Sequence, residues 1–223
     1  MPSIHLETPR PITNRGEEHI ACAVVVDTSG SMHGYEQELK QAIHEMMEAI
    51  MEDDMARGRV ELCLITYDST ARMVQPFGPM HMFEAPGEIC CKGMTSTHAA
   101  IRMALDAVKA RTAEYDAQGV ARKRPWLWLL TDGGSNDADN GSYHELMDMQ
   151  LNGQLNFFGV GIGPEADASE LKSMHKKHQM LRVNREDFLE AFKLISQSMS
   201  KSSSSTAGMA TLQLGQQISV ETD

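Results

Sequence analysis

The sequence predicts an α/β fold: a doubly wound, mostly parallel sheet of six strands, with one antiparallel edge strand and helices on both faces. Three observations indicate this class. The best developed apolar runs lack alternating polar residues, as in strands that are covered on both faces. Segments with helical periodicity separate most of the runs, and such crossover connections join parallel strands. One pair of runs is too close together for a crossover and predicts a hairpin.

Six apolar runs mark the expected strands. Runs 60–67 and 71–74 are joined only by "DST", so we expect an antiparallel hairpin that places 71–74 at an edge of the sheet. Because the other runs are separated by longer segments, we expect their strands to be parallel. The six runs are 20–26, 60–67, 71–74, 126–130, 155–162 and the weaker 180–183.

Apolar residues three and four positions apart predict three amphipathic helices between these strands. The first covers 39–50, the second covers 101–108, and the third follows the last strand at 188–199. Their apolar stripes are Leu39, Ile43, Met46, Met47 and Ile50; Ile101, Ala104, Leu105 and Val108; and Phe188, Phe192, Ile195 and Met199.

Two capping boxes predict further helix starts. Ser142 is followed three residues later by Glu145, and Asp167 is followed at the same spacing by Glu170. In such a box the first side chain accepts a hydrogen bond from the backbone of the third helical residue, whose own side chain bonds back. We therefore expect helices to begin at both places.

The length of 223 residues fits one α/β domain. We expect an extended N-terminal segment at 1–18, the domain at 19–200 and a serine-rich flexible tail at 201–223. The sequence "LQLGQQISV" in the tail leaves open that this part pairs with a sheet edge.

With 20 lysines and arginines against 31 aspartates and glutamates, the net charge is −11. Such a surface repels nucleic acid and anionic lipid, so we expect neither as a partner.

The sequence predicts a cytoplasmic protein. Its first residues lack the apolar core of a signal peptide, and no stretch approaches the roughly 18 apolar residues of a membrane span. The four cysteines include no Cys-x-x-Cys pair, which argues against a disulfide scaffold or a zinc knuckle. We expect reduced thiols.

Three separate segments carry oxygen-bearing side chains where a strand ends or a helix begins. Ligands of an open α/β sheet bind beyond the carboxyl ends of its strands, so we expect the three segments to converge there. Carboxylate and hydroxyl oxygens suit Mg²⁺, Mn²⁺ or Ca²⁺ better than zinc or copper. The segments are "DTSGSM" with Asp27, Ser29 and Ser31; "GMTSTHAAI" with Thr95, Ser96 and Thr97; and "LLTDGG" with Thr131 and Asp132.

Only two of these residues, Asp27 and Asp132, are carboxylates at strand ends. Neutral hydroxyls complete the set, so a divalent cation held there keeps its attraction for a further anion. A carboxylate from another molecule fits a vacant coordination position.

The order Asp-x-Ser-x-Ser, threonine, Thr-Asp-Gly resembles the metal-ion-dependent adhesion site of von Willebrand factor type A domains. The resemblance extends over about 20–199. Within this family, "VVVDTSGSM", "ITYDSTARMVQPF" and "FKLISQSMSKSSSS" are most similar to bacterial proteins of the TerY type, which are associated with tellurite resistance and stress response.

The resemblance implies a binding module and not an enzyme. It implies metal ligation, direct or through water, by Asp27, Ser29, Ser31, Thr95 and Asp132. Mg²⁺ is the expected ion, with Mn²⁺ or Ca²⁺ as alternatives, and Ser96 or Thr97 could replace Thr95. The expected ligand is a Glu or Asp of a partner protein, and TerY-like systems suggest kinase-like, phosphatase-like or TerD-like partners.

Other interpretations remain. In a Mg²⁺-dependent phosphohydrolase of the haloacid dehalogenase type, Asp27 would be the nucleophile. That family needs a second aspartate two residues later, where this sequence has Ser29. The sequence "GVGIG" could suggest nucleotide binding, but Gly159 and Gly161 more simply let a helix pack closely on a strand. Asp27–Ser31 could also only shape a turn.

Overall fold

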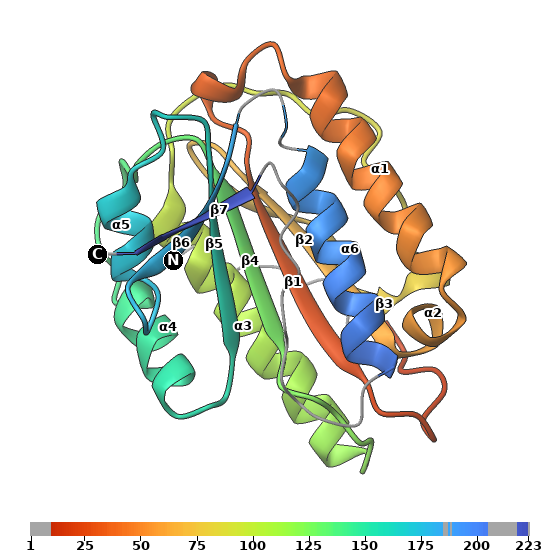
Figure 1. Cartoon of the computed structure of the whole chain (residues 1–223). Helices are drawn as coiled ribbons and strands as arrows, with labels where there is room; N and C mark the ends of the chain where they lie inside the picture. The colour runs from red at the N-terminus through yellow and green to blue at the C-terminus, as the bar shows by residue number, and fades with distance from the viewer. Residues whose placement is uncertain (1–9, 185–186, 188, 205–217, 223) are drawn as a thin grey trace.

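The computed structural model describes residues 10–184, 187, 189–204 and 218–222, and shows one mixed sheet between two layers of helices (Figure 1). The order of strands across the sheet is β3-β2-β1-β4-β5-β6-β7. The strands are β1 (Ile20–Asp27), β2 (Val60–Tyr67), β3 (Ala71–Pro79), β4 (Trp126–Thr131), β5 (Asn156–Ile162), β6 (Gln179–Val183) and β7 (Ile218–Thr222).

The predicted fold class is confirmed, with one correction to the number of strands. β1 pairs in parallel with β2 and β4, and β4, β5 and β6 continue the parallel arrangement. β2 and β3 form the expected antiparallel hairpin at one edge. The sheet has seven strands instead of six, because β7 pairs antiparallel with β6 at the other edge. Both edges are therefore antiparallel.

Helices cover both faces of the sheet. Figure 1 shows α1, α2 and α6 on one side and α3, α4 and α5 on the other. The helices are α1 (Glu36–Glu52), α2 (Asp54–Arg59), α3 (Thr97–Ala117), α4 (Ser142–Leu151), α5 (Ala168–Ser173) and α6 (Leu189–Ser204), with short 3₁₀ turns η1 (Gly30–Met32) and η2 (Met80–Met82). The three periodic helices are present, although Phe188 lies outside the described residues.

The central strand β1 divides the core into two parts. Val24 and Val26 belong to the cluster that packs under α1 and α6, whereas Ala23 and Val25 belong to the cluster under α3. This alternation follows from the two-residue period of a strand. All eight residues of β1 are buried, which explains why the sequence of this strand lacks polar alternation.

One of the two predicted caps is confirmed. The Asp167 carboxylate accepts a hydrogen bond from the backbone of Glu170 over 2.9 Å and caps α5. At Ser142 the predicted helix start is confirmed, but the predicted cap is wrong. Ser142 is the first residue of α4, Gly141 takes the cap position, and the Ser142 hydroxyl donates to the carbonyl oxygen of His98. The spacing of Ser142 and Glu145 therefore predicted where α4 begins but not which groups cap it.

The expected tail at 201–223 includes regular structure. Residues 201–204 complete α6, 218–222 form β7, and 205–217 and 223 lie outside the described residues. β7 is joined to β6 by its strand pairing and by an ion pair between Arg182 and Glu221. Among the described helices, none is sufficiently long and apolar to cross a lipid bilayer.

Candidate metal centre

Asp27 is the last residue of β1, and its carboxylate is fully buried. One oxygen, Oδ1, accepts a hydrogen bond from the backbone N–H of Ser29 over 2.8 Å. The other, Oδ2, accepts one from the Thr131 hydroxyl over 2.6 Å. Burial raises the pKa of Asp27 to about 6; these hydrogen bonds oppose the rise, and the nearby Asp132 charge adds to it. Protein groups thus fix both oxygens in place.

A chain of hydroxyls connects the first segment to the third. The Ser31 hydroxyl donates to Asp132 Oδ1 over 2.6 Å, and the Ser29 and Ser31 hydroxyl oxygens are 3.0 Å apart. Because the hydroxyl hydrogen of Ser31 is directed to Asp132, Ser29 is the donor of the second bond. Asp27, Ser29, Ser31 and Asp132 therefore lie together at the carboxyl ends of the neighbouring strands β1 and β4.

Thr95 is brought to this group by the backbone contacts of its loop. Its loop lies against the first segment, where Gly30 N–H donates to Gly93 O over 3.1 Å and Lys92 N–H donates to Thr28 O over 2.9 Å. Thr95 is buried, and the described hydrogen bonds do not connect its hydroxyl to the other four residues. The structure thus brings the three predicted segments to one edge of the sheet.

Two residues that the sequence analysis missed hold the second and third segments together. Asn136 Oδ1 accepts from the Thr95 N–H over 3.1 Å, and the Asn136 N–H donates back to Thr95 O over 2.8 Å. Asp137 accepts from the backbone N–H groups of His98 and Ala99 and so caps α3 from about 40 positions away in sequence. Capping rules consider sequence neighbours, so no local signal indicates this contact.

The donor set fits a hard divalent cation. Serine hydroxyls keep lone pairs on oxygen when they donate a hydrogen bond, and two carboxylates supply negative charge. Hydroxyl, carboxylate and water oxygens are the ligands that Mg²⁺ and Ca²⁺ prefer. Over the part of the chain that the structure describes, no three His, Cys, Asp or Glu side chains are grouped to hold a metal ion, as nitrogen and sulfur sites require.

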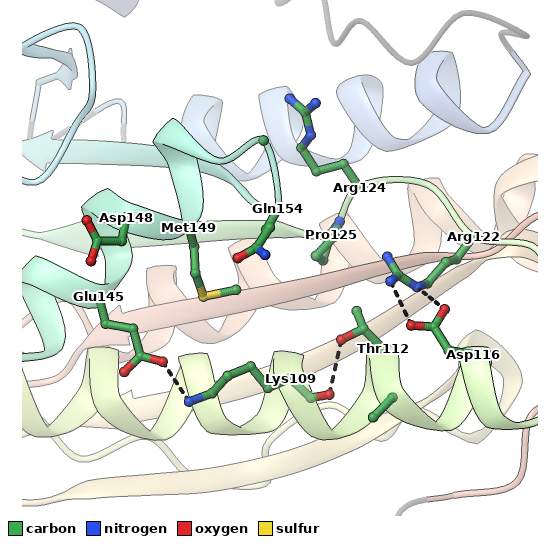
Figure 2. A pocket seen from close by; sticks show the side chains of 12 residues that line it. Lys109, Thr112, Asp116, Arg122, Arg124, Pro125, Glu145, Asp148, Met149 and Gln154 are labelled. Atoms are coloured by element: carbon green, nitrogen blue, oxygen red, sulfur yellow. Dashed lines mark hydrogen bonds and ion pairs between the residues drawn. The ribbon is translucent and has the colours of Figure 1, made fainter.

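A cavity of about 780 Å³ lies elsewhere, between α3 and α4 near the amino ends of β4 and β5 (Figure 2). Four of its charged side chains form two ion pairs: Lys109 contacts Glu145 over 2.7 Å, and Arg122 contacts Asp116 over 2.8 Å. Because this is the opposite edge of the sheet, the cavity does not contribute to the carboxylate and hydroxyl cluster.

The glycines of β5 have a packing role, as expected. A Cβ atom at Gly161 would lie 2.4 Å from Met180 Cε and 3.0 Å from Ala166 Cβ, and one at Gly159 would lie 3.2 Å from a methyl group of Leu171 in α5. A side chain at either glycine would push against these neighbours, so the two glycines allow close packing on β5. The "GVGIG" sequence is thereby explained by packing, without a nucleotide.

Comparisons with solved structures support the same fold. Proximal thread matrix protein 1 from the mussel byssus is 16% identical, with a TM-score of 0.55 over 82% of this chain and 48% of that one. A second structure of that protein is described as having a zinc-occupied MIDAS (metal-ion-dependent adhesion site) motif. It is 15% identical, with a TM-score of 0.53 over 84% of this chain and 46% of that one. This chain thus spans less than half of that protein.

A third similar structure is the vWF domain of the type V pili tip protein Mfa5 from Porphyromonas gingivalis. It is 12% identical, with a TM-score of 0.57 over 86% of this chain and 98% of that domain. No curated protein matches the sequence. At such identities, the structural similarity establishes the fold alone.

The sequence itself matches a family model. The model describes the von Willebrand factor type A domain and matches residues 22–134, about half of the chain. The match includes the three segments that meet at the carboxyl edge of the sheet. The chain therefore belongs to the von Willebrand factor type A domain family.

Proposed function

We propose that this protein is a recognition module that binds a divalent cation and, through it, an acidic side chain of a partner protein. The proposed ligands, direct or through water, are Asp27, Ser29, Ser31, Thr95 and Asp132. The observation that carries the proposal is the hydrogen-bonded chain from Ser29 through Ser31 to Asp132, which joins residues 101 positions apart into one oxygen-rich cluster.

Mg²⁺ is the ion that we propose for the cell. Magnesium retains coordinated water, which suits carboxylates such as Asp27 that the protein already engages through both oxygens. The zinc found in the mussel byssus protein makes Zn²⁺ the alternative to be tested. With only two carboxylates in the set, the bound ion keeps its attraction for a carboxylate from outside.

The biological setting is a finer proposal. The TerY-like sequence segments suggest a bacterial cytoplasmic stress-response complex with kinase-like, phosphatase-like or TerD-like proteins. The four cysteines are free thiols, as a reducing compartment requires. Cell fractionation and identification of chelator-released partners test this setting.

A phosphohydrolase that uses Asp27 is the competing proposal. A nucleophilic carboxylate must reach a phosphorus atom, whereas Asp27 is fully buried and both its oxygens accept hydrogen bonds. Ser29 also takes the place of the acid/base aspartate of the haloacid dehalogenase family. If the protein released phosphate from p-nitrophenyl phosphate in the presence of Mg²⁺, and if Asp27→Asn abolished this activity, the result would favour the phosphohydrolase proposal.

The decisive experiment combines calorimetry with partner capture. Mg²⁺, Mn²⁺ and Zn²⁺ are titrated into wild type, Asp132→Ala and Asp139→Ala, the last a matched control because Asp139 is 75% exposed on the same loop. We expect saturable binding by wild type and the control but not by Asp132→Ala. At a metal concentration of 100 times Kd, the free energy of unfolding should rise by about 2.7 kcal/mol.

Partner capture from the host lysate is then compared with and without chelator. Partners of the metal site should be lost with chelator and with Asp132→Ala but retained by Asp139→Ala. Capture that is equal under all these conditions would contradict the bridging role of the metal.

A further inference from the structure

One large apolar side chain is exposed beside the metal site. Met94 is 56% exposed and directly precedes Thr95. Single exposed apolar residues are common on protein surfaces, so exposure alone indicates nothing. The other exposed large apolar residues in the described parts of the chain lie within strands or toward the amino edge of the sheet: Met55, Val74, Met82, Leu151 and Val220.

The backbone holds Met94 in this position. Its N–H donates to the Ser69 hydroxyl over 3.0 Å. Gly93 has φ +78°, and a Cβ atom there would lie 2.5 Å from Ser69 Oγ. The Gly93 carbonyl in turn accepts the N–H of Gly30 from the first metal-site segment. These contacts fix the backbone on both sides of Met94 and so hold its Cα at the surface beside Thr95.

A positive charge lies next to Met94. Exposed Lys92 lies in the same loop as Met94, and its charge helps to lower the pKa of Asp68 in the adjacent hairpin turn. The exposed Asp139, in the loop after Asp132, lies 3.7 Å from His98 near the start of α3. The positive charge of Lys92 therefore attracts an acidic partner segment to the neighbourhood of Met94.

We propose that Met94 is a specificity-determining contact, against which a partner segment packs an apolar side chain next to the Asp or Glu that approaches the metal. This inference rests on the proposed function of the metal site. An unbranched thioether adapts to apolar groups of different shape, which suits a contact at a recognition surface. Burial of such a side chain corresponds to about 10-fold or more in affinity.

To test this, peptides from a random displayed library are selected for binding to the protein at saturating Mg²⁺. Bound peptides are then eluted with a chelator and sequenced. The selection compares wild type, Met94→Ser, Met94→Leu and Leu151→Ser. Leu151 is a matched control because it is 66% exposed at the far end of α4. Mg²⁺ affinity is measured for each variant by calorimetry.

We expect wild type, Met94→Leu and Leu151→Ser to select an Asp or Glu with an apolar neighbour. Met94→Ser should keep the acidic residue, lose the apolar preference, and bind the wild-type peptides about 10-fold more weakly at saturating Mg²⁺. An unchanged apolar preference in Met94→Ser would overturn the role of Met94 and leave the metal site as proposed. Absence of chelator-eluted peptides from Mg²⁺-bound wild type would overturn both.

Discussion

The Thr131 hydroxyl donates a hydrogen bond of 2.6 Å to Asp27 Oδ2, although the two residues are 104 positions apart in sequence. The bond is possible because β1 and β4 are neighbouring parallel strands whose carboxyl ends meet. Together with the Ser29 N–H on Oδ1, it fixes the plane of the Asp27 carboxylate. Thr131 thus positions a residue that we propose to act on the metal.

Replacement of Thr131 by valine should weaken metal binding. Valine has the same shape but no hydroxyl, so Asp27 loses the donor to Oδ2, and removal of such an outer hydrogen bond commonly costs about 10–100-fold in metal affinity. Thr131→Ser keeps the hydroxyl and should bind nearly as wild type does. Calorimetric titration with Mg²⁺ and Mn²⁺ measures both variants; equal affinity in Thr131→Val would argue against the positioning role.

Replacement of Asp137 by alanine should destabilise the start of α3. Asp137 accepts hydrogen bonds from His98 and Ala99, whereas Ser96 at the cap position makes no side-chain cap bond. Loss of a cap costs about 1 kcal/mol in the free energy of unfolding. Asp139→Ala removes a hydrogen bond accepted from the Gly141 N–H and a 3.7 Å contact with His98 from a side chain that is 75% exposed, and should cost less. Urea unfolding followed by circular dichroism compares them.

Near the C-terminal end of α3, Arg111 forms a buried ion pair with Glu61 of β2. Arg111 Nε donates to Glu61 Oε2 over 2.5 Å, and both side chains are almost completely buried. Arg111→Met removes the permanent positive charge beside buried Glu61, which then keeps only His19 at 3.5 Å, and should cost about 3–5 kcal/mol of stability. The double variant Glu61→Leu/Arg111→Met removes both charges and should recover much of that loss. Chemical unfolding compares wild type, Glu61→Leu, Arg111→Met and the double variant, and strictly additive effects would contradict coupling between the two side chains.

Protonation of His175 should lower stability in acid. Burial lowers the pKa of His175 to about 4 from its ordinary value of 6.5, and nearby Lys176 adds to this. Its Nδ1 also accepts the N–H of Lys177 over 3.2 Å, which requires the neutral ring. As the pH falls from about 6.5 to about 4, the unfolded chain takes up this proton first, so stability falls; above pH 7 it is unaffected.

The matched variant for this effect is His175→Asn, whose amide oxygen can accept the same bond but does not titrate. Wild type should lose stability relative to this variant only over the acidic range. Urea unfolding at a series of pH values measures the difference, and a constant difference from pH 4 to pH 8 would contradict the assignment.

The sequence predicted the features that have local signals. Six strands were visible as apolar runs because most are buried on both faces, and the three metal-site segments were visible because their side chains recur at short spacing. β7 was harder to predict: three of the five residues in "ISVET" are polar, and its partner β6 lies about 40 residues earlier. Only the pairing with Met180 and its neighbours makes it a strand.

Rules that consider only neighbouring positions in the sequence could not predict contacts between residues that are distant in sequence. Asn136 fixes the Thr95 loop, and Asp137 caps α3, yet both follow the third segment and look in sequence like parts of an acidic surface loop. At Ser142, by contrast, a local signal was present but the predicted contact does not form. Its spacing to Glu145 matched a capping box, but the Glu145 carboxylate contacts Lys109 of α3 instead. Tertiary contacts decided these three side chains.

The antiparallel strand β7 has a consequence for solubility. A strand at the border of a sheet offers unpaired N–H and C=O groups that can recruit another chain. β7 satisfies those groups along β6, and the Arg182–Glu221 ion pair helps to hold it there. β7 is itself a border strand, but it is polar and mostly exposed. A protein shortened before Ile218 would make the more apolar β6 the border strand, and we expect it to self-associate.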